Sequence, residues 1–309
     1  MVGIRLVSTL AVVALIGSAC TAGDAAEPAP TSTFAPLLTQ GGAAPQTAAQ
    51  PTTPSTTEPP PAKETTTSTT LPANECVPEP VAGFDDAGFF TQGCTVLGID
   101  IVASSEVAPE ALIAAAERIH GMLVGRLDYA AYVASSGITA AVIGADERIT
   151  DLPPFQDLYE QYPGTDWRRA GRSFTATDLV PWFAGAEENL SCTTEDRYEG
   201  EDMLLRDLAR TVRDYPMRAL DASTDSAIES VYGRAIAAGL WRDTLAENNS
   251  DTYWMEGVQS WFDGNREADP PDTAHNHVDT RRELAEYDPA LADLIRVVLG
   301  DGGFRAPCG

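Results

Sequence analysis

A change of composition at Cys76 constrains the fold of this chain more than any other feature. Between Thr21 and Glu75 the sequence is dominated by Thr, Pro, Ala and Ser and has few large apolar residues. Such a segment cannot bury enough apolar surface to offset the entropy lost on folding, so we expect a disordered linker. The folded part is therefore expected to span residues 76–309, a length that suits one domain with a sizeable core.

The first 20 residues have the pattern of an export signal. Arg5 supplies a positive charge, Leu6–Ile16 is an apolar run too short to span a bilayer, and Gly17-Ser-Ala-Cys20 resembles the lipobox of bacterial lipoproteins. We expect a lipoprotein signal peptide at 1–19 and an acylated Cys20 that begins the linker of residues 20–75. Two acyl chains suffice for stable anchoring, here at the extracytoplasmic face of the cell membrane. An ordinary cleaved secretory signal, with Cys20 unmodified, is the alternative.

The charge of the chain limits its partners. It has 46 acidic residues against 20 Lys and Arg, which gives a formal net charge of −26. A surface of this sign repels polyanions, so nucleic acid and anionic lipid are not expected as partners of the folded part.

Four cysteines follow Cys20, and an even number in an exported chain implies two disulfides. Three connectivities are possible. Nearness in sequence favours Cys76–Cys94, which leaves Cys192–Cys308 as the second bridge. The spacing does not resemble a zinc site, so we expect the cysteines to be structural.

Hydrophobic periodicity predicts two strands followed mainly by helices. The strands are expected at residues 95–103 and 138–143. The helices are expected at residues 109–127, 200–214, 225–240, 251–262 and 280–299. Strands that precede helices, rather than alternating with them, indicate an α+β fold.

Two of these helical segments carry a family resemblance. Gly200–Asp214 contains Arg-Asp-Leu-Ala-Arg, and Thr252–Asp263 contains Tyr-Trp-Met-Glu-Gly-Val-Gln-Ser-Trp-Phe. Together with Ala186–Cys192 and His275–Arg281, they resemble a family of secreted bacterial and fungal zinc peptidase-like proteins akin to the catalytic domain of anthrax lethal factor. The resemblance implies a zincin-like domain at 76–309, with a small N-terminal strand and helix portion and a helical C-terminal half.

The resembled family binds zinc through His-Glu-x-x-His on the first helix and a glutamate on the second. Here the corresponding positions hold Arg206, Asp207, Arg210 and Glu256. A guanidinium stays protonated and has no free lone pair for a metal, and Asp207 is one methylene shorter than glutamate. We therefore expect no zinc cofactor and no zinc-dependent peptidase activity.

A buried carboxylate that has lost its metal needs another cation. Arg206 and Arg210 lie one helical turn apart on one face, so we expect one of them to pair with Glu256, with Arg210 preferred. The alternative is a solvent-exposed stripe formed by Arg206, Arg210 and Arg213.

The chain has three histidines, and only His275 and His277 lie close together. Two imidazoles separated by one residue can share a metal ion on an extended segment. Hydrogen bonding within a loop is the simpler interpretation.

These features favour a membrane-anchored, extracytoplasmic protein with an inactive peptidase-like domain retained for binding a peptide, glycan or protein, or for scaffolding. A divergent hydrolase that uses a relocated metal, or Asp207 and Glu256 as an acid/base pair, is the alternative. A purely structural envelope protein is the third possibility.

Overall fold

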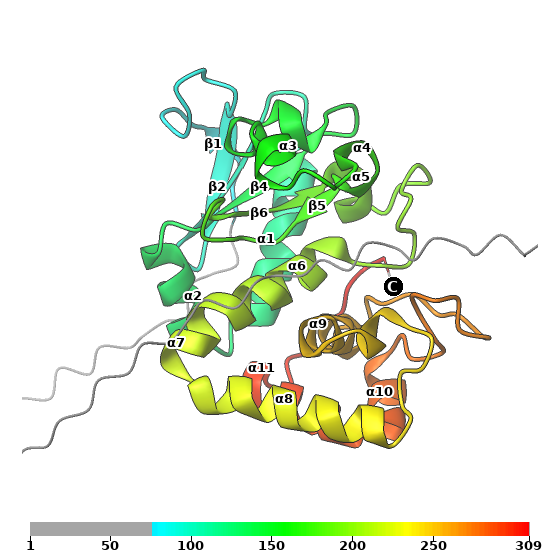
Figure 1. Ribbon diagram of the computed structural model, residues 1–309. Helices are drawn as coiled ribbons and strands as arrows, with labels where there is room; N and C mark the ends of the chain where they lie inside the picture. The colour runs from blue at the N-terminus through cyan, green and yellow to red at the C-terminus, as the bar shows by residue number, and fades with distance from the viewer. Residues whose placement is uncertain (1–75, 309) are drawn as a thin grey trace, which may run out of the picture. The chain divides into compact units, whose positions relative to one another are not determined.

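The structure, a computed structural model, describes residues 76–308. The expectations for the signal peptide (1–19), for Cys20 and for the linker (20–75) lie outside the described residues. Within the described part, all strands come from residues 79–186, and helices dominate from there to residue 299 (Figure 1). The fold is therefore α+β with a helical C-terminal half, as expected.

One sheet of six strands lies in the N-terminal half, in the spatial order β1-β2-β3-β4-β6-β5. The strands are β1 Glu79–Pro80, β2 Gln92–Val96, β3 Ile99–Ala103, β4 Thr139–Ile143, β5 Ser173–Phe174 and β6 Trp182–Ala186. The pairs β3–β4 and β4–β6 are parallel, whereas β1–β2, β2–β3 and β5–β6 are antiparallel. The short strand β5 therefore forms one edge of the sheet.

The register of the central strands divides the apolar side chains between two cores. One level of the register contributes to the larger core: Ile101, Ala140 and Phe183. The next level contributes to the smaller core on the opposite face: Val102, Ala141 and Ala184. Because both faces are covered, these strands are apolar at most positions rather than alternating.

The segment 95–103, expected as one strand, is instead a hairpin. β2 ends at Val96 and β3 begins at Ile99, and the two residues between them, Leu97 and Gly98, have φ angles of 50° and 83°. Two consecutive residues with positive φ make the turn whose twist suits a two-residue hairpin. The single-strand prediction is wrong because the apolar pattern continues through the turn.

Helices cover the larger core on one side of the sheet. They are α1 Pro109–Leu123, α2 Leu127–Ser135, α6 Met203–Val212, α8 Ala222–Ala237, α9 Ser250–Trp261, α10 Arg281–Tyr287 and α11 Pro289–Leu299. α6 contacts the sheet, and α8 to α11 gather beyond it, away from the strands (Figure 1). α9 and α11 pack closely because Gly257 has no side chain; a Cβ there would lie 2.4 Å from Leu291 Cδ2.

Three of the predicted helices end or break differently in the structure. The segment 109–127 is helical only to Leu123, and α2 was not predicted at all. The segment 280–299 is two helices, because Asp288 interrupts the first and its carboxylate caps the second. The segment 200–214 begins at Met203 as α6 and continues after residue 212 as a π-helical turn, η3, over Arg213–Met217.

Short helices cover the other face of the sheet. They are the 3₁₀ turns η1 Ile149–Asp151 and η2 Pro153–Phe155, and the single-turn helices α3 Leu158–Gln161 and α4 Trp167–Ala170. Phe155, Leu158 and Trp167 belong to the smaller core there, together with Phe174 of β5. The sequence did not predict β5 or β6, because β6 is a short, fully apolar run that lacks the alternation of a half-buried strand.

Two disulfides close the domain. They join Cys76 to Cys94 and Cys192 to Cys308, the pairing that nearness in sequence favours. The second bridge ties the segment before α6 to the C-terminal end of the domain across 116 residues.

Candidate functional site

The candidate site lies where α6 and α9 pack together. Asp202 caps the first turn of α6 and also forms a buried ion pair with Arg118, with 2.8 Å between Nε and Oδ2. Trp254 of α9 donates its indole N–H to the carbonyl oxygen of Ala209 at 3.0 Å. Together these contacts hold α6 in place and fix its position against α9, which carries Glu256.

Glu256 is buried between two cations. Its side chain is 2 % exposed, with Oε1 3.6 Å from Nε of Arg206 and Oε2 3.5 Å from Nδ1 of His275. Asn265 donates its amide N–H to Oε2 at 3.3 Å. Burial opposes the charge of Arg206, but the carboxylates of Glu256, Asp207 and Glu201 together outweigh burial and raise the pKa of this guanidinium. The expectation that Glu256 pairs with an arginine of the first helix is confirmed for Arg206.

His275 joins Glu256 to a second buried carboxylate, that of Glu201. Its Nε2 lies 3.0 Å from Oε1 of Glu201, and its backbone N–H is held by Asp272 Oδ1 at 2.9 Å. Burial lowers the pKa of His275, but the carboxylates of Glu201 and Glu256 together outweigh it and raise the pKa to about 9. The imidazole is therefore protonated at neutral pH, and both of its N–H groups face carboxylates.

Arg210, the arginine expected to pair with Glu256, has other partners. Its Nε lies 2.5 Å from Oδ2 of Asp214, and its Nη1 lies 2.6 Å from Oδ2 of Asp251. The prediction for Arg210 is wrong because two carboxylates meet its guanidinium at the opposite end of the helix pair. Asp251 is in the first turn of α9, whereas Glu256 is more than one turn further along.

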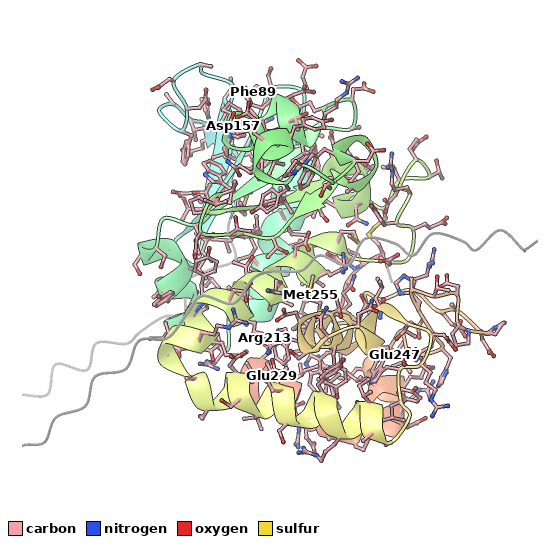
Figure 2. All side chains as sticks on the ribbon, viewed as in Figure 1. Phe89, Asp157, Arg213, Glu229, Glu247 and Met255 are labelled. Atoms are coloured by element: carbon pink, nitrogen blue, oxygen red, sulfur yellow. A yellow bond between two sulfur atoms is a disulfide. The ribbon has the colours of Figure 1, made fainter. Side chains whose placement is uncertain are left out.

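Arg213 also contradicts the alternative of a solvent-exposed arginine stripe. Its side chain is 0 % exposed and is surrounded by carboxylates, with ion-pair distances of 2.7 Å to Asp225, 2.5 Å to Glu229 and 2.9 Å to Asp251. Figure 2 shows Arg213 and Glu229 side by side, where α8 approaches the end of α6. The arginines of this helix are therefore structural ion-pair partners rather than a solvated face.

Asp207 faces the sheet rather than Glu256. Its Oδ1 accepts a hydrogen bond from the Thr175 hydroxyl at 3.0 Å, just after the edge strand β5. The side chain is buried, and burial raises the pKa of this carboxyl above its usual value even though Arg206 opposes the shift. Asp207 thus links α6 to the edge of the sheet.

A cleft of about 540 Å³ opens beside these residues. β5 and the following Thr175 line one side, and α6 contributes Arg206 and Asp207. The remaining lining residues are Thr165, Trp167, Ala170, Arg197, Tyr198, Glu201, Met203, Leu245, Arg266, Ala274 and His275. The cleft therefore combines charged groups with apolar side chains, and a strand edge borders it.

The side chains around Glu256 do not fit a zinc ion. A zinc ion needs several neutral imidazole or anionic ligands, whereas Glu256 Oε1 faces a guanidinium and Oε2 faces a protonated imidazole. Arg206 Nε, Glu256 Oε1 and His275 Nδ1 are buried without hydrogen bonds, and they interact by charge at 3.5–3.6 Å. The position is thus built for a paired carboxylate.

His275 and His277 lie in different surroundings. His277 is exposed, and its ring meets the Tyr287 ring edge-on with 5.2 Å between centroids. The sequence identified His275 only as a weak metal candidate in a loop, and it did not identify Glu201 or Asn265 as neighbours of Glu256. No local pattern connects these residues, because they come from separate loops that only the tertiary structure brings together.

The chain matches no protein-family model, no curated protein and no solved structure. In the part of the chain that the structure describes, no helix is long and apolar enough to cross a membrane. The geometry of the cleft, and of Glu256 with Arg206 and His275, is therefore the basis for a functional proposal.

Proposed function

We propose that residues 76–309 form a zincin-like binding domain without zinc catalysis, held at the extracytoplasmic face of the cell membrane by acylated Cys20. The observation that carries this proposal is the environment of Glu256. In the resembled family this glutamate binds zinc, and here it pairs with Arg206 and His275. Two cations thus balance the carboxylate, so the helix pair can keep its packing without a metal.

An extended peptide is the ligand that this cleft suits best. β5 is paired with β6 on one side only and forms the border of the cleft. An extended chain can add to an exposed strand edge through main-chain hydrogen bonds, while pockets beside the edge select side chains. Arg206, Glu201 and Asp207 provide both signs of charge for that selection.

A divergent hydrolase is the second candidate, and one observation favours it. Asp207 lines the cleft, and burial raises the pKa of its carboxyl, as in carboxyl groups that act as general acids. The geometry favours it less than binding, because Glu256, the other carboxylate of the proposed pair, is engaged by Arg206 and His275.

Selection of displayed peptides on the purified full-length protein tests the binding proposal. We expect selected peptides to bind saturably and to remain uncleaved. Ala274→Trp, which fills the cleft from its rim, should abolish that binding. Ala290→Trp, at an exposed position outside the cleft lining, is the matched control and should bind as the unaltered protein does.

Three results would count against this function. Peptides that bind the Ala274→Trp variant as well as the unaltered protein would show that the cleft is not the site. Failure to select any saturable binder would remove the support for a peptide ligand. Cleavage of a bound peptide that is lost in Asp207→Asn would favour the hydrolase instead.

A further inference from the structure

A second pocket, which we call the arginine pocket, lies among the C-terminal helices. It has a volume of about 570 Å³ and shares no lining residue with the cleft beside Glu256. It is lined by Trp261 at the end of α9, by Asp263 just after that helix, by residues of α10 and α11, and by the C-terminal segment. Four arginines contribute to it: Arg281, Arg282, Arg296 and Arg305. This concentration of positive charge stands out in a chain with a net charge of −26.

Arg281 is the central cation of the arginine pocket. Its guanidinium carbon lies 4.0 Å from the centroid of the Trp261 ring, and its Nε and Nη2 donate to the carbonyl oxygens of Trp261 and Gly302 at 2.8 and 3.3 Å. Asp263 Oδ1 accepts the backbone N–H of Arg281 rather than a guanidinium proton. Among residues 76–308, no carboxylate forms an ion pair with this guanidinium.

The charge of Arg281 is therefore poorly compensated. Burial and the nearby Arg305 guanidinium lower the pKa of Arg281 to about 10, in spite of the opposing influence of Asp263. The guanidinium of Arg281 remains protonated at neutral pH, but no carboxylate of the described residues pairs with this positive charge. An external anion at this point would supply the missing charge.

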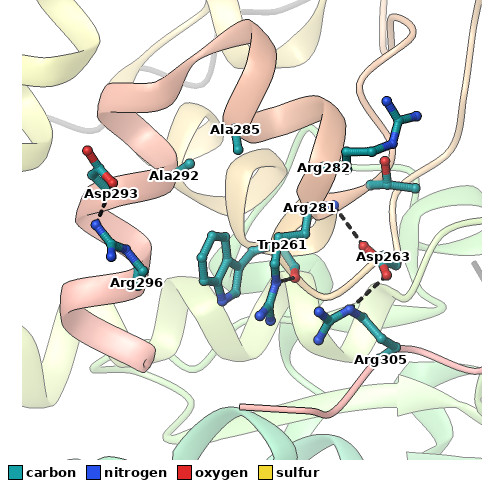
Figure 3. A pocket seen from close by; sticks show the side chains of 10 residues that line it. Trp261, Asp263, Arg281, Arg282, Ala285, Ala292, Asp293, Arg296 and Arg305 are labelled. Atoms are coloured by element: carbon teal, nitrogen blue, oxygen red, sulfur yellow. Dashed lines mark hydrogen bonds and ion pairs between the residues drawn. The ribbon is translucent and has the colours of Figure 1, made fainter. Parts of the chain in front are cut away.

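The other arginines of the pocket each form an ion pair with a carboxylate. Arg305 pairs with Asp263, with 2.8 Å from Nε to Oδ2, and Arg296 pairs with Asp293 at 2.6 Å. Figure 3 shows these two arginines on either side of Trp261, while Arg282 points away from them. Arg282 is 70 % exposed and pairs with acidic residues of its own helix, so Arg281 and Arg305 are the arginines best placed to hold an anion.

We propose that the arginine pocket binds a small organic anion, with a carboxylate or phosphate group on Arg281 and Arg305 and an apolar body beside Trp261. Guanidinium groups match the oxygens of these anions in charge and in donor geometry. Trp261, Ala285 and Ala292 provide apolar lining, and the volume lies in the range of pockets that hold small molecules. This site is separate from the cleft of the proposed function and does not depend on it.

Calorimetric titration of the full-length protein in detergent tests the proposal with defined probes. Phenyl phosphate and benzoate carry the two candidate anions on one apolar body, inorganic phosphate lacks the body, and phenol lacks the charge. We expect saturable binding of phenyl phosphate, benzoate or both, weaker binding of inorganic phosphate and none of phenol. Arg281→Gln should weaken binding by about tenfold or more, because it removes a charged donor. Arg242→Gln, which removes an arginine at an exposed position outside the pocket lining, should leave it unchanged.

A second variant keeps the test decisive if Arg281→Gln does not fold. Ala285→Glu adds a carboxylate at the exposed rim of the pocket, and the alanine side chain that it replaces makes no hydrogen bond. The added negative charge should abolish binding of the anion. Ala290→Glu adds the same charge at an exposed position outside the pocket and should bind normally. The proposal is overturned if neither phenyl phosphate nor benzoate binds saturably, or if Ala290→Glu reduces binding as much as Ala285→Glu.

Discussion

Arg206 of α6 and Glu256 of α9 form an ion pair, with 3.6 Å between Nε and Oε1, that joins the two helices. The carboxylate is 2 % exposed and the arginine side chain 21 %. His275 meets the other carboxylate oxygen at 3.5 Å. The pair therefore connects α6 to α9 through the buried carboxylate of Glu256, which would be costly to leave without a cation.

Removal of Arg206 alone should destabilise the domain. Arg206→Met leaves Glu256 buried with only His275 as a cation, and we expect the free energy of unfolding to fall by about 3 kcal/mol. The double variant Arg206→Met with Glu256→Leu should recover most of this loss. Urea unfolding measures both values, with Arg282→Met as a control that should change stability by less than about 0.5 kcal/mol. A double variant no more stable than Arg206→Met would contradict the pairing.

Stability should fall as the pH rises from near neutral to about 9. The pKa of His275 is about 9 in the folded protein and about 6.5 in an unfolded chain. Because the folded state binds the proton more tightly, this contribution is complete below pH 6.5 and is lost as the pH rises through 9. Its size is on the order of 3 kcal/mol.

Urea unfolding between pH 6 and pH 10 measures this dependence. His275→Gln should flatten the slope in the stated window, whereas the exposed His277→Gln should keep it. Equal slopes in the unaltered protein and in His275→Gln would show that the imidazolium does not contribute.

The purified protein should contain far less than one zinc per chain, since the proposed resemblance would place Arg206 and Arg210 at two of three zinc-ligand positions, and a guanidinium cannot bind the metal. Metal analysis of protein isolated without chelators checks this. The triple variant Arg206→His, Asp207→Glu and Arg210→His should gain zinc affinity, and that gain should vanish when Glu256→Gln is added. Zinc near one per chain in the unaltered protein, lost in Glu256→Gln alone, would refute the prediction.

The two disulfides should differ in how much they stabilise the domain. Cys192–Cys308 closes a segment of 116 residues and Cys76–Cys94 one of 18. Loop-closure entropy predicts losses of about 5 and about 3 kcal/mol when each pair is replaced by alanine. Thermal unfolding of the two double-alanine variants measures the difference. A smaller loss for Cys192–Cys308 would contradict the entropic account.

Cys20→Ser should release the protein from membranes into the soluble fraction. The prediction follows from the apolar run that ends in Gly17-Ser-Ala-Cys20. Fractionation and detection of the acyl group by mass spectrometry provide the measurements, and Thr21→Ala serves as the neighbouring control. Unchanged membrane association of Cys20→Ser would rule out this anchor.

Local patterns in the sequence determined much of the helical half. The positions of α6, α8 and α9 follow from apolar periodicity, which depends on residues a few positions apart. The chemistry of Arg206 and Arg210 likewise excludes them as zinc ligands, because a guanidinium has the same donors in any fold. The preferred disulfide pairing could also be inferred from the sequence, because Cys76 and Cys94 are near each other and leave Cys192 and Cys308 as the second pair.

Only the tertiary structure decided which charges meet. Arg206 and Arg210 lie on one helical face, and their order along α6 does not show which is opposite Glu256. The packing of α9 places Asp251, in its first turn, beside Arg210. Glu256, further along α9, therefore pairs with Arg206. His275 contacts Glu256 from a loop, and a loop has no periodic pattern from which the direction of a side chain can be predicted. Strand β6 was not predicted for a related reason: its parallel partner β4 is distant in the sequence, and the stability of a strand depends on such pairing.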